Sequence, residues 1–277
     1  MSDCKTGGGG QCQDYDERDR YSGKGNDSDF PTPTQKPADP ERERYDKAIK
    51  QLCNNRVGSP SSELRNISKA ERDQFAATLD RVFPGIKKGE KNTYLRMFDH
   101  EGGMKENIGR DKDGKKIVRA MSGGIKSGTL KELVRNKLFK ESKETMAGGK
   151  LTMVGVAKAY RGYFDYSLKS VGGHQALEAL SEKSGNQVFT ALVADTLYQQ
   201  GIAGGATIIR GALEPNSPVK RGVMDAQTWS RLLDVAGNKS RQPELNNMII
   251  RRKFETVGDK ISTGDVGRFK SFCHQGI

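Results

Sequence analysis

The sequence has no apolar run close to the ~20 residues that cross a bilayer, and its first residues lack the apolar core of a signal peptide. We therefore expect no membrane span, and synthesis in the cytoplasm without a signal peptide. Cysteine is scarce: none of Cys4, Cys12, Cys53 and Cys273 forms a CxxC pair. Zinc-binding or thioredoxin-type chemistry is therefore not indicated, whereas both a Cys4–Cys12 disulfide and free thiols remain open.

Histidine is nearly absent, with three copies in the chain. His174 and His274 have no evident partners in the sequence, and we expect neither a metal site nor a cofactor. The sequence also lacks an RNP motif, zinc-finger spacing and a basic leucine-zipper pattern. Specific nucleic-acid binding is therefore not expected.

Acidic residues are outnumbered, because 47 Lys and Arg stand against 35 Asp and Glu, which gives a formal net charge of +12. This balance favours anionic partners such as nucleic acid, lipid surfaces or the bacterial cell wall. The positive charge is spread along the chain, which is typical of a basic solvated surface. A basic polyanion-binding protein is the non-enzymatic alternative that this charge leaves open.

Leu, Ile and Val are missing from the N-terminal part of the chain, where the first of them is Ile49. The same part contains four consecutive glycines from Gly7 and several prolines after Phe30. Such a segment cannot bury enough apolar surface to offset the loss of chain entropy. We therefore predict a disordered leader over residues 1–40, which is either a delivery segment or a plain linker.

The rest of the chain, residues 41–277, is predicted to form one domain of mainly α (α+β) class. Its β-lobe is expected at about 104–128 and its helical body at about 129–277. A capping box, Ser68 to Glu71, opens a helix with Phe75 and Leu79 inward. The other helices are expected at 41–53, up to Glu101, from Thr129, and at 153–168, 175–181, 186–200, 206–213, from Asp225 and at 243–254, with Phe83, Phe269 and Phe272 as further packing residues and Gly172-Gly173, Gly204-Gly205 and Gly237-Asn238 as breaks.

The segment Tyr94–Gly103 places a carboxylate on an apolar helix face. Tyr94, Met97, Phe98 and Glu101 fall at i, i+3, i+4 and i+7, and two glycines follow as a helix stop. Burial raises the pKa of a carboxyl, and a carboxyl that stays protonated near neutral pH suits a general acid. The alternative is that Glu101 is an ordinary surface residue at a helix end.

Beyond Gly103 the sequence becomes glycine-rich, and Asp113-Gly114 is a hairpin signal. Ile117, Val118 and Met121 supply short strand material. Thr129 to Glu132 has the spacing of a second capping box, and it predicts a helix with Leu130, Val134 and Leu138 on one face. A carboxylic acid at a helix end between a small β-lobe and a helical body is a workable site for cleavage of a glycosidic bond.

Several segments resemble glycoside hydrolase family 108, the phage and bacterial muramidases with a lysozyme-like fold. Phe98–Gly103 resembles the HEGG signature of that family. The further similar segments, in the order of the chain, are 122–129, 189–195, 206–210 and 222–229. The resemblance implies a lysozyme-like fold over about residues 90–272. It also implies hydrolysis of the β-1,4 bond between N-acetylmuramic acid and N-acetylglucosamine of peptidoglycan, with Glu101 as the catalytic acid.

The second catalytic group stays open between Asp111, Asp113 and Thr129. Asp113 precedes Gly114 and is equally a turn residue, and Thr129 is equally a helix cap. A carboxylate ~6.5–9.5 Å from Glu101 would give inversion, whereas a missing one would suit a lytic transglycosylase. His100 points about 100° away from Glu101 on a helix. We expect it to have a structural role at the helix end, and we also place it with Lys126 and Ser127 among the candidate substrate-binding residues.

A wall-active domain with a long leader and no signal peptide resembles a toxin that a type VI secretion system delivers into the periplasm of a rival cell. This architecture implies an immunity protein that blocks the cleft, and a contact between the leader and the secretion apparatus. A phage endolysin of the same fold is the competing setting.

Overall fold

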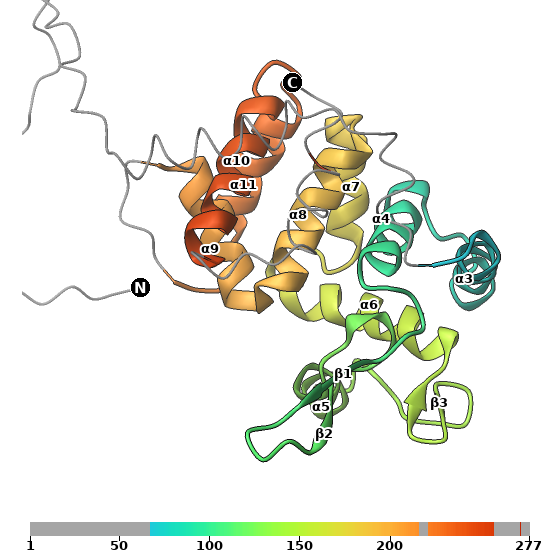
Figure 1. The fold of residues 1–277 in the computed structure, drawn as a ribbon. Coiled ribbons are helices and arrows are strands. Elements are labelled where there is room, and N and C mark those ends of the chain that lie inside the picture. The colour runs from blue at the N-terminus through green and yellow to red at the C-terminus, as the bar shows by residue number, and fades with distance from the viewer. Residues whose placement is uncertain (1–66, 216–220, 258–271, 273–277) are drawn as a thin grey trace, which may run out of the picture. The chain divides into compact units, whose positions relative to one another are not determined.

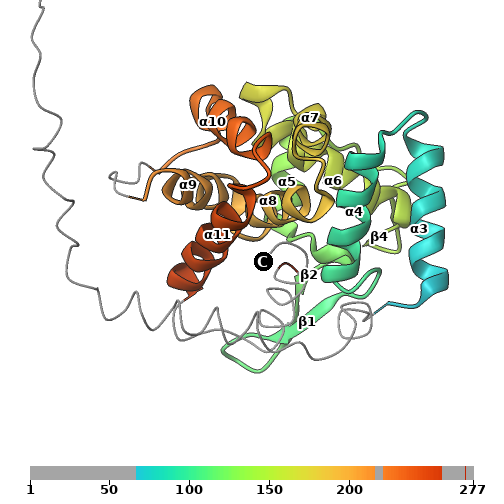
Figure 2. The same ribbon diagram turned by 90° about the horizontal axis from the view of Figure 1, so that it is seen from above.

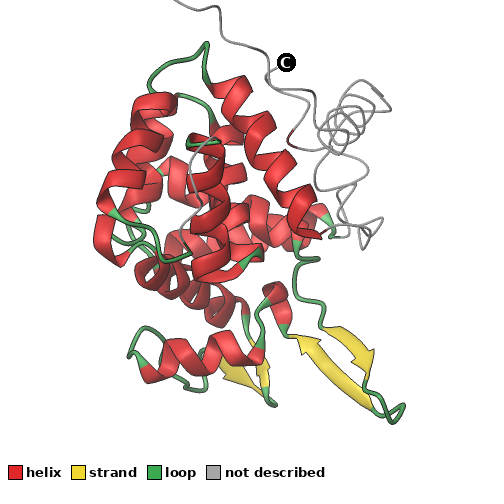
Figure 3. Ribbon diagram, turned by 90° about the vertical axis from the view of Figure 1, so that its left-hand side faces the viewer, coloured by secondary structure: helices red, strands yellow, loops and turns green. Residues whose placement is uncertain are grey.

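The computed structural model describes residues 67–215, 221–257 and 272, all within one unit of the chain, Asp39–Ile277 (Figure 1). The predicted leader, the predicted helix at 41–53 and Phe269 lie outside the described residues. The described part is mainly helical with two small two-stranded sheets (Figure 3), as the class prediction stated. Its elements are α3 (Lys69–Val82), α4 (Lys88–His100), β1 (Asn107–Arg110), β2 (Lys116–Ala120), the 3-10 turn η1 (Ser122–Gly124), α5 (Ser127–Arg135), β3 (Met146–Ala147), β4 (Lys150–Leu151), α6 (Met153–Ser167), the 3-10 turn η2 (Lys169–Val171), α7 (Gln175–Ser184), α8 (Gln187–Gln199), α9 (Gly201–Leu213), α10 (Ala226–Ala236) and α11 (Gln242–Val257).

Helix α3 begins as predicted, because the Ser68 side chain accepts the Glu71 N–H and satisfies one of the free donors of the first turn. Phe75 and Leu79 are fully buried, as expected. The Glu71 side chain does not complete the capping box. Its Oε1 instead accepts the Met104 N–H at 2.7 Å, so this carboxylate ties α3 to the chain that follows α4.

Helix α4 buries the predicted face. Tyr94, Met97 and Phe98 are all buried, and the Phe98 ring stacks on Phe75 of α3 with centroids 4.0 Å apart. The helix ends at His100, with Glu101 as its C-cap residue rather than in its last turn. Gly102 and Gly103 follow with φ of +78° and +67°, a region that side-chain-bearing residues rarely adopt. These two glycines are therefore the helix stop that the sequence predicts.

Strands β1 and β2 form an antiparallel hairpin around the predicted Asp113-Gly114 turn. The Asp111 carboxylate holds this turn, because its Oδ1 accepts the N–H groups of Asp113 at 3.0 Å and Lys115 at 2.9 Å. Met121 lies just beyond β2 and not within it. A second hairpin, β3–β4, lies within the predicted helical body at about 129–277.

The prediction that Thr129 caps a helix is wrong. Helix α5 begins at Ser127 with Lys126 as N-cap residue, so Thr129 is the third residue of the helix. The inward face is formed by Leu130 and Leu133, whereas Val134 is exposed. Only Ile125 and Lys126 separate η1 from α5, so the helix starts earlier than predicted, and the buried Leu133 lies on its inward face.

Helix α8 lies at the centre of the helical body (Figure 2). It packs against α4, α7, α9 and α11, and nearly all of its residues are buried. The Asn186 side chain starts it by accepting the N–H groups of Val188 and Phe189. Trp229 and Leu232 of α10 are buried, and Asp225 caps that helix. Phe272 is also buried, as predicted. In the described residues, no helix has the length and apolarity that crossing a membrane requires.

The prediction that Gly204-Gly205 interrupts the chain is wrong, because both glycines lie inside α9. A Cβ atom on Gly205 would come within 2.5 Å of the Leu197 Cα atom and 2.7 Å of the Thr196 carbonyl oxygen. The missing side chain therefore lets α9 lie against the backbone of α8. The break between these helices is at Gly201 instead, where φ is +70°.

Replacement of Gly205 with alanine is expected to lower the free energy of unfolding by ~1–3 kcal/mol, because backbone atoms of α8 cannot give way as a flexible side chain does. Gly204→Ala is the matched control on the same helix, since its nearest neighbour is the Gln200 side chain at 3.3 Å. It is expected to stay within about 0.5 kcal/mol of wild type. Urea unfolding followed by circular dichroism measures both, and equal effects would refute the packing argument.

Candidate active site at the end of helix α4

Glu101 is half-buried at the junction of α4, η1 and α8. A Cβ atom on Gly124 of η1 would overlap the Glu101 carboxylate, so this glycine makes room for the acid. From the other side, the Gln199 side-chain amide at the end of α8 donates to Glu101 Oε1. The carboxylate is therefore held between a glycine loop and an amide donor, neither of which the helix pattern indicated.

The η1 loop that contacts Glu101 is held in place by three hydrogen bonds at Gly123. The Gly123 N–H donates to the Gly103 carbonyl oxygen at 2.8 Å, which joins η1 to the end of α4. The Gly123 carbonyl oxygen accepts the phenols of Tyr160 at 2.9 Å and Tyr198 at 3.0 Å. A side chain on Gly123 would strike Val156 of α6. Because side chains of α6 and α8 bind the Gly123 carbonyl oxygen, the loop holds Gly124 against Glu101.

The carboxylate of Asp195 on α8 lies one turn before Gln199 and contacts His100, the residue that precedes Glu101. Asp195 and Gln199 are four residues apart and share a helix face. Asp195 Oδ1 is 3.5 Å from His100 Nδ1, and its Oδ2 accepts the Lys253 ammonium of α11 at 2.6 Å. The Asp195 and Lys253 side chains are only 3% and 2% exposed. Two residues on one face of α8 thus contact the end of α4. Asp195 contacts His100, and Gln199 contacts Glu101.

His100 is not placed for the substrate-binding role that we assigned to it. Its side chain is 2% exposed and its ring meets the edge of Phe272 at a centroid distance of 5.3 Å. The His100 ring is therefore buried between Asp195 of α8 and Phe272. It braces the last turn of α4.

The remaining predicted site residues lie on the two segments that flank η1. Asp111 and Asp113 are at the tip of the β1–β2 hairpin, where Asp111 stabilises the turn and Asp113 is exposed. Lys126 and Ser127 are exposed at the start of α5, and Thr129 is half-buried in its first turn. Since α5 begins three residues after Gly124, Lys126, Ser127 and Thr129 come shortly after the loop that contacts Glu101.

Asp99 is a further acid that the sequence reasoning missed. Burial raises the pKa of its carboxyl, and the Arg72 guanidinium, whose Nε donates to Asp99 Oδ2 at 3.0 Å, acts in the opposite direction. Burial also lowers the pKa of Arg96 on the same helix. Asp99 therefore belongs to a charged contact with α3, on another side of α4 from Glu101.

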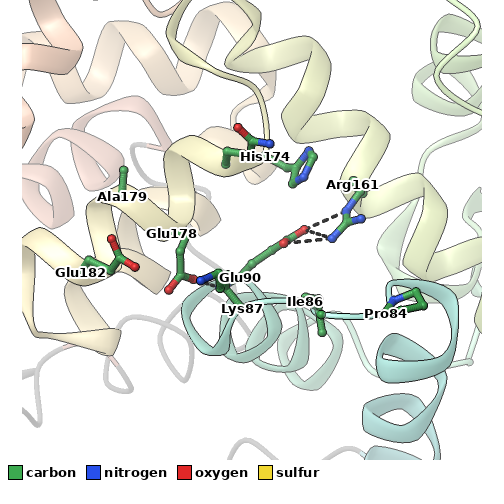
Figure 4. A pocket seen from close by; sticks show the side chains of 11 residues that line it. Pro84, Ile86, Lys87, Glu90, Arg161, His174, Glu178, Ala179 and Glu182 are labelled. Atoms are coloured by element: carbon green, nitrogen blue, oxygen red, sulfur yellow. Dashed lines mark hydrogen bonds and ion pairs between the residues drawn. The ribbon is translucent and has the colours of Figure 1, made fainter.

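A pocket of about 570 Å³ lies at the opposite end of α4, between this helix, α6 and α7 (Figure 4). Glu90 is buried there and pairs with Arg161, whose Nε and Nη2 donate to its two oxygens at 2.9 and 3.0 Å. Burial, followed by the charge of Glu90, raises the pKa of the Tyr94 phenol well above its usual value. Glu90 lies one turn before Tyr94, so the periodicity that singled out Glu101 also places Glu90 on the buried face.

The Glu90 pocket lies about 16 Å from Glu101 along the axis of α4. Its acid is already paired with a bidentate guanidinium, which makes it a structural contact between α4 and α6. Among the described residues, no group of three or more His, Cys, Asp and Glu side chains is arranged to hold a metal ion. The arrangement around Glu101 is therefore the candidate active site.

Comparisons with protein-family models, with curated proteins and with solved structures found no match to this chain.

Proposed function

We propose that this chain is a peptidoglycan hydrolase, an N-acetylmuramidase with a lysozyme-like arrangement, in which Glu101 is the general acid. One observation carries the proposal: the carboxyl of Glu101 is half-buried at the end of an apolar helix, against a glycine loop and an amide donor. A charge-driven binding protein has no need for a carboxylate in this position.

In this mechanism Glu101 donates its proton to the glycosidic oxygen as the bond to the anomeric carbon breaks. The sugar of the leaving group departs as an alcohol, and Glu101 is left as a carboxylate. The Gln199 amide donates to Glu101 Oε1, so it orients the carboxyl. The electron-poor anomeric carbon then forms a bond to the oxygen of a water molecule, or to the substrate's own hydroxyl in a lytic transglycosylase. The proton lost from that oxygen goes to the Glu101 carboxylate or to a second carboxylate.

The candidates for the second catalytic group of this mechanism are Asp111, Asp113 and Thr129. One Asp111 oxygen is occupied by two backbone N–H groups of the turn, which supports a structural role for this residue. Thr129 follows η1 by five residues and is half-buried, which favours it as a group that positions water near Glu101. A threonine hydroxyl orients water but is a poor base at neutral pH.

For the biological setting we propose an antibacterial toxin that a type VI secretion system delivers into the periplasm of a target cell. The sequence pattern of a polar leader before a wall-active domain supports this setting. A cognate immunity protein that blocks the site beside Glu101 is the expected partner, and the leader is the expected contact with the secretion apparatus.

The deciding experiment is mass spectrometry of the fragments released from purified Gram-negative sacculi by the full-length protein. A reducing-end muramic acid supports the muramidase, and a 1,6-anhydro end supports the transglycosylase alternative with the same acid. Release of peptide stems, or of no fragments at all, would refute cleavage of the glycan by this chain.

A further inference from the structure

The β1–β2 hairpin carries an exposed face that no described element covers. Ile108 and Val118 lie directly opposite each other in the register of the two strands, and they are 58% and 48% exposed. Residues opposite each other in an antiparallel pair point to the same side of the sheet. The two aliphatic side chains therefore form one apolar pair on this face.

A basic pair continues the same face toward the turn. Arg110 lies opposite Lys116, and both are exposed. Each is two residues away along its strand from a member of the apolar pair, so both point to the same side as that pair. We call the four residues Ile108, Val118, Arg110 and Lys116 the hairpin face.

The opposite side of the hairpin is arranged differently. The Arg119 side chain lies across Gly109, where a Cβ atom would collide with it, and Ile117 is less exposed than Ile108 or Val118. Over the whole hairpin, Lys and Arg outnumber the two acids Asp111 and Asp113, and Asp111 is used in the turn. The hairpin face therefore combines uncompensated positive charge with exposed methyl groups, which suits an anionic partner with small apolar groups.

The root of the hairpin is continuous with the candidate active site. β2 ends at Ala120, and Gly123 and Gly124 of η1 contact the end of α4 and Glu101. The hairpin extends from this junction away from the helices, as Figure 3 shows. A polymer that is cleaved beside Glu101 would therefore have parts that reach the hairpin.

We propose that the hairpin face binds the peptide stems of peptidoglycan, an inference that rests on the proposed function. These stems are short, carry several carboxylates and contain alanine methyl groups. Arg110 and Lys116 pair with the carboxylates, and Ile108 and Val118 contact the methyl groups. The hairpin thereby selects glycan that still carries its peptides, while Glu101 cleaves the sugar bond.

The test is cosedimentation of the full-length Glu101→Gln protein with intact sacculi and with glycan strands from which an amidase has removed the peptides. The double variant Arg110→Glu with Lys116→Glu, made in that background, is expected to bind intact sacculi about tenfold more weakly at low ionic strength. Its binding to the peptide-free strands is expected to be unchanged. Ile108→Ser with Val118→Ser is expected to weaken binding to intact sacculi at high salt as well.

The matched control is Lys239→Glu with Arg241→Glu, which changes the net charge equally on the exposed segment between α10 and α11. It is expected to bind both materials like the parent protein. Equal losses for this control, for peptide-free strands or for an oligonucleotide duplex would overturn the proposal in favour of general polyanion attraction. If the wild-type chain cleaves nothing but binds sacculi through the hairpin and the peptides, the proposed activity fails and the binding inference stands.

Discussion

Glu101→Gln is expected to lower the rate of sacculus cleavage by ~10²–10⁴-fold or more while the protein remains folded. The amide has nearly the size of the carboxyl, so the packing against Gly124 is kept, but it has no acidic proton to donate to the leaving oxygen. The measurement is the rate of release of soluble muropeptides, with near-UV and far-UV circular dichroism to verify the fold.

Two control variants test whether the loss of activity is specific to Glu101. Glu141→Gln removes an exposed carboxylate from the segment between α5 and β3 and is expected to leave the rate unchanged. Asp99→Asn tests the other acid near the end of α4, whose pKa burial raises. A large loss for Asp99→Asn together with an active Glu101→Gln would show that the proton comes from Asp99, and the assignment of Glu101 would then be withdrawn.

Asp195→Ala is expected to lower the free energy of unfolding by ~3–5 kcal/mol, because it leaves the Lys253 ammonium buried without its carboxylate. The loss extends to the active site, since Asp195 also holds His100 next to Glu101. We therefore expect lower activity even at temperatures at which the variant is folded. Urea unfolding and the rate on sacculi measure the two effects.

The double variant Asp195→Leu with Lys253→Met separates an unpaired charge from a loss of packing. Apolar residues of similar size replace both ions, and most of the lost stability is expected to return, as is common when a buried ion pair is replaced as a whole. The exposed pair Lys69–Asp73 serves as the comparison, and Asp73→Ala there is expected to cost less than about 1 kcal/mol. A mild effect of Asp195→Ala alone would contradict this account of the buried pair.

Predictions from the sequence succeeded where the signal was local. The face of α4 follows from the spacing of Tyr94, Met97 and Phe98, and its end follows from two glycines in a conformation that favours glycine. The hairpin turn at Asp113-Gly114 follows in the same way from short-range chemistry. In each case a few neighbouring residues contain all the information.

Predictions failed where a residue serves a distant neighbour. The adjacent glycines predict a break at Gly204-Gly205, but Gly205 is needed because the backbone of α8 lies against it. The spacing of Thr129 to Glu132 predicts a helix cap, but α5 begins two residues before Thr129. A glycine or threonine has the same appearance in the sequence whether it serves a turn, a cap or a contact between helices.

The sequence by itself determined the mainly helical class, the helix that ends just before Glu101, and the loop of glycines that follows. Only the tertiary structure decided what surrounds this acid: Gln199 is 98 residues away along the chain, and the buried pair of Asp195 and Lys253 joins residues 58 apart. The physical reason is that helix faces and turns depend on neighbours within a few residues, whereas the groups that hold a carboxylate come from helices that meet only when the core packs.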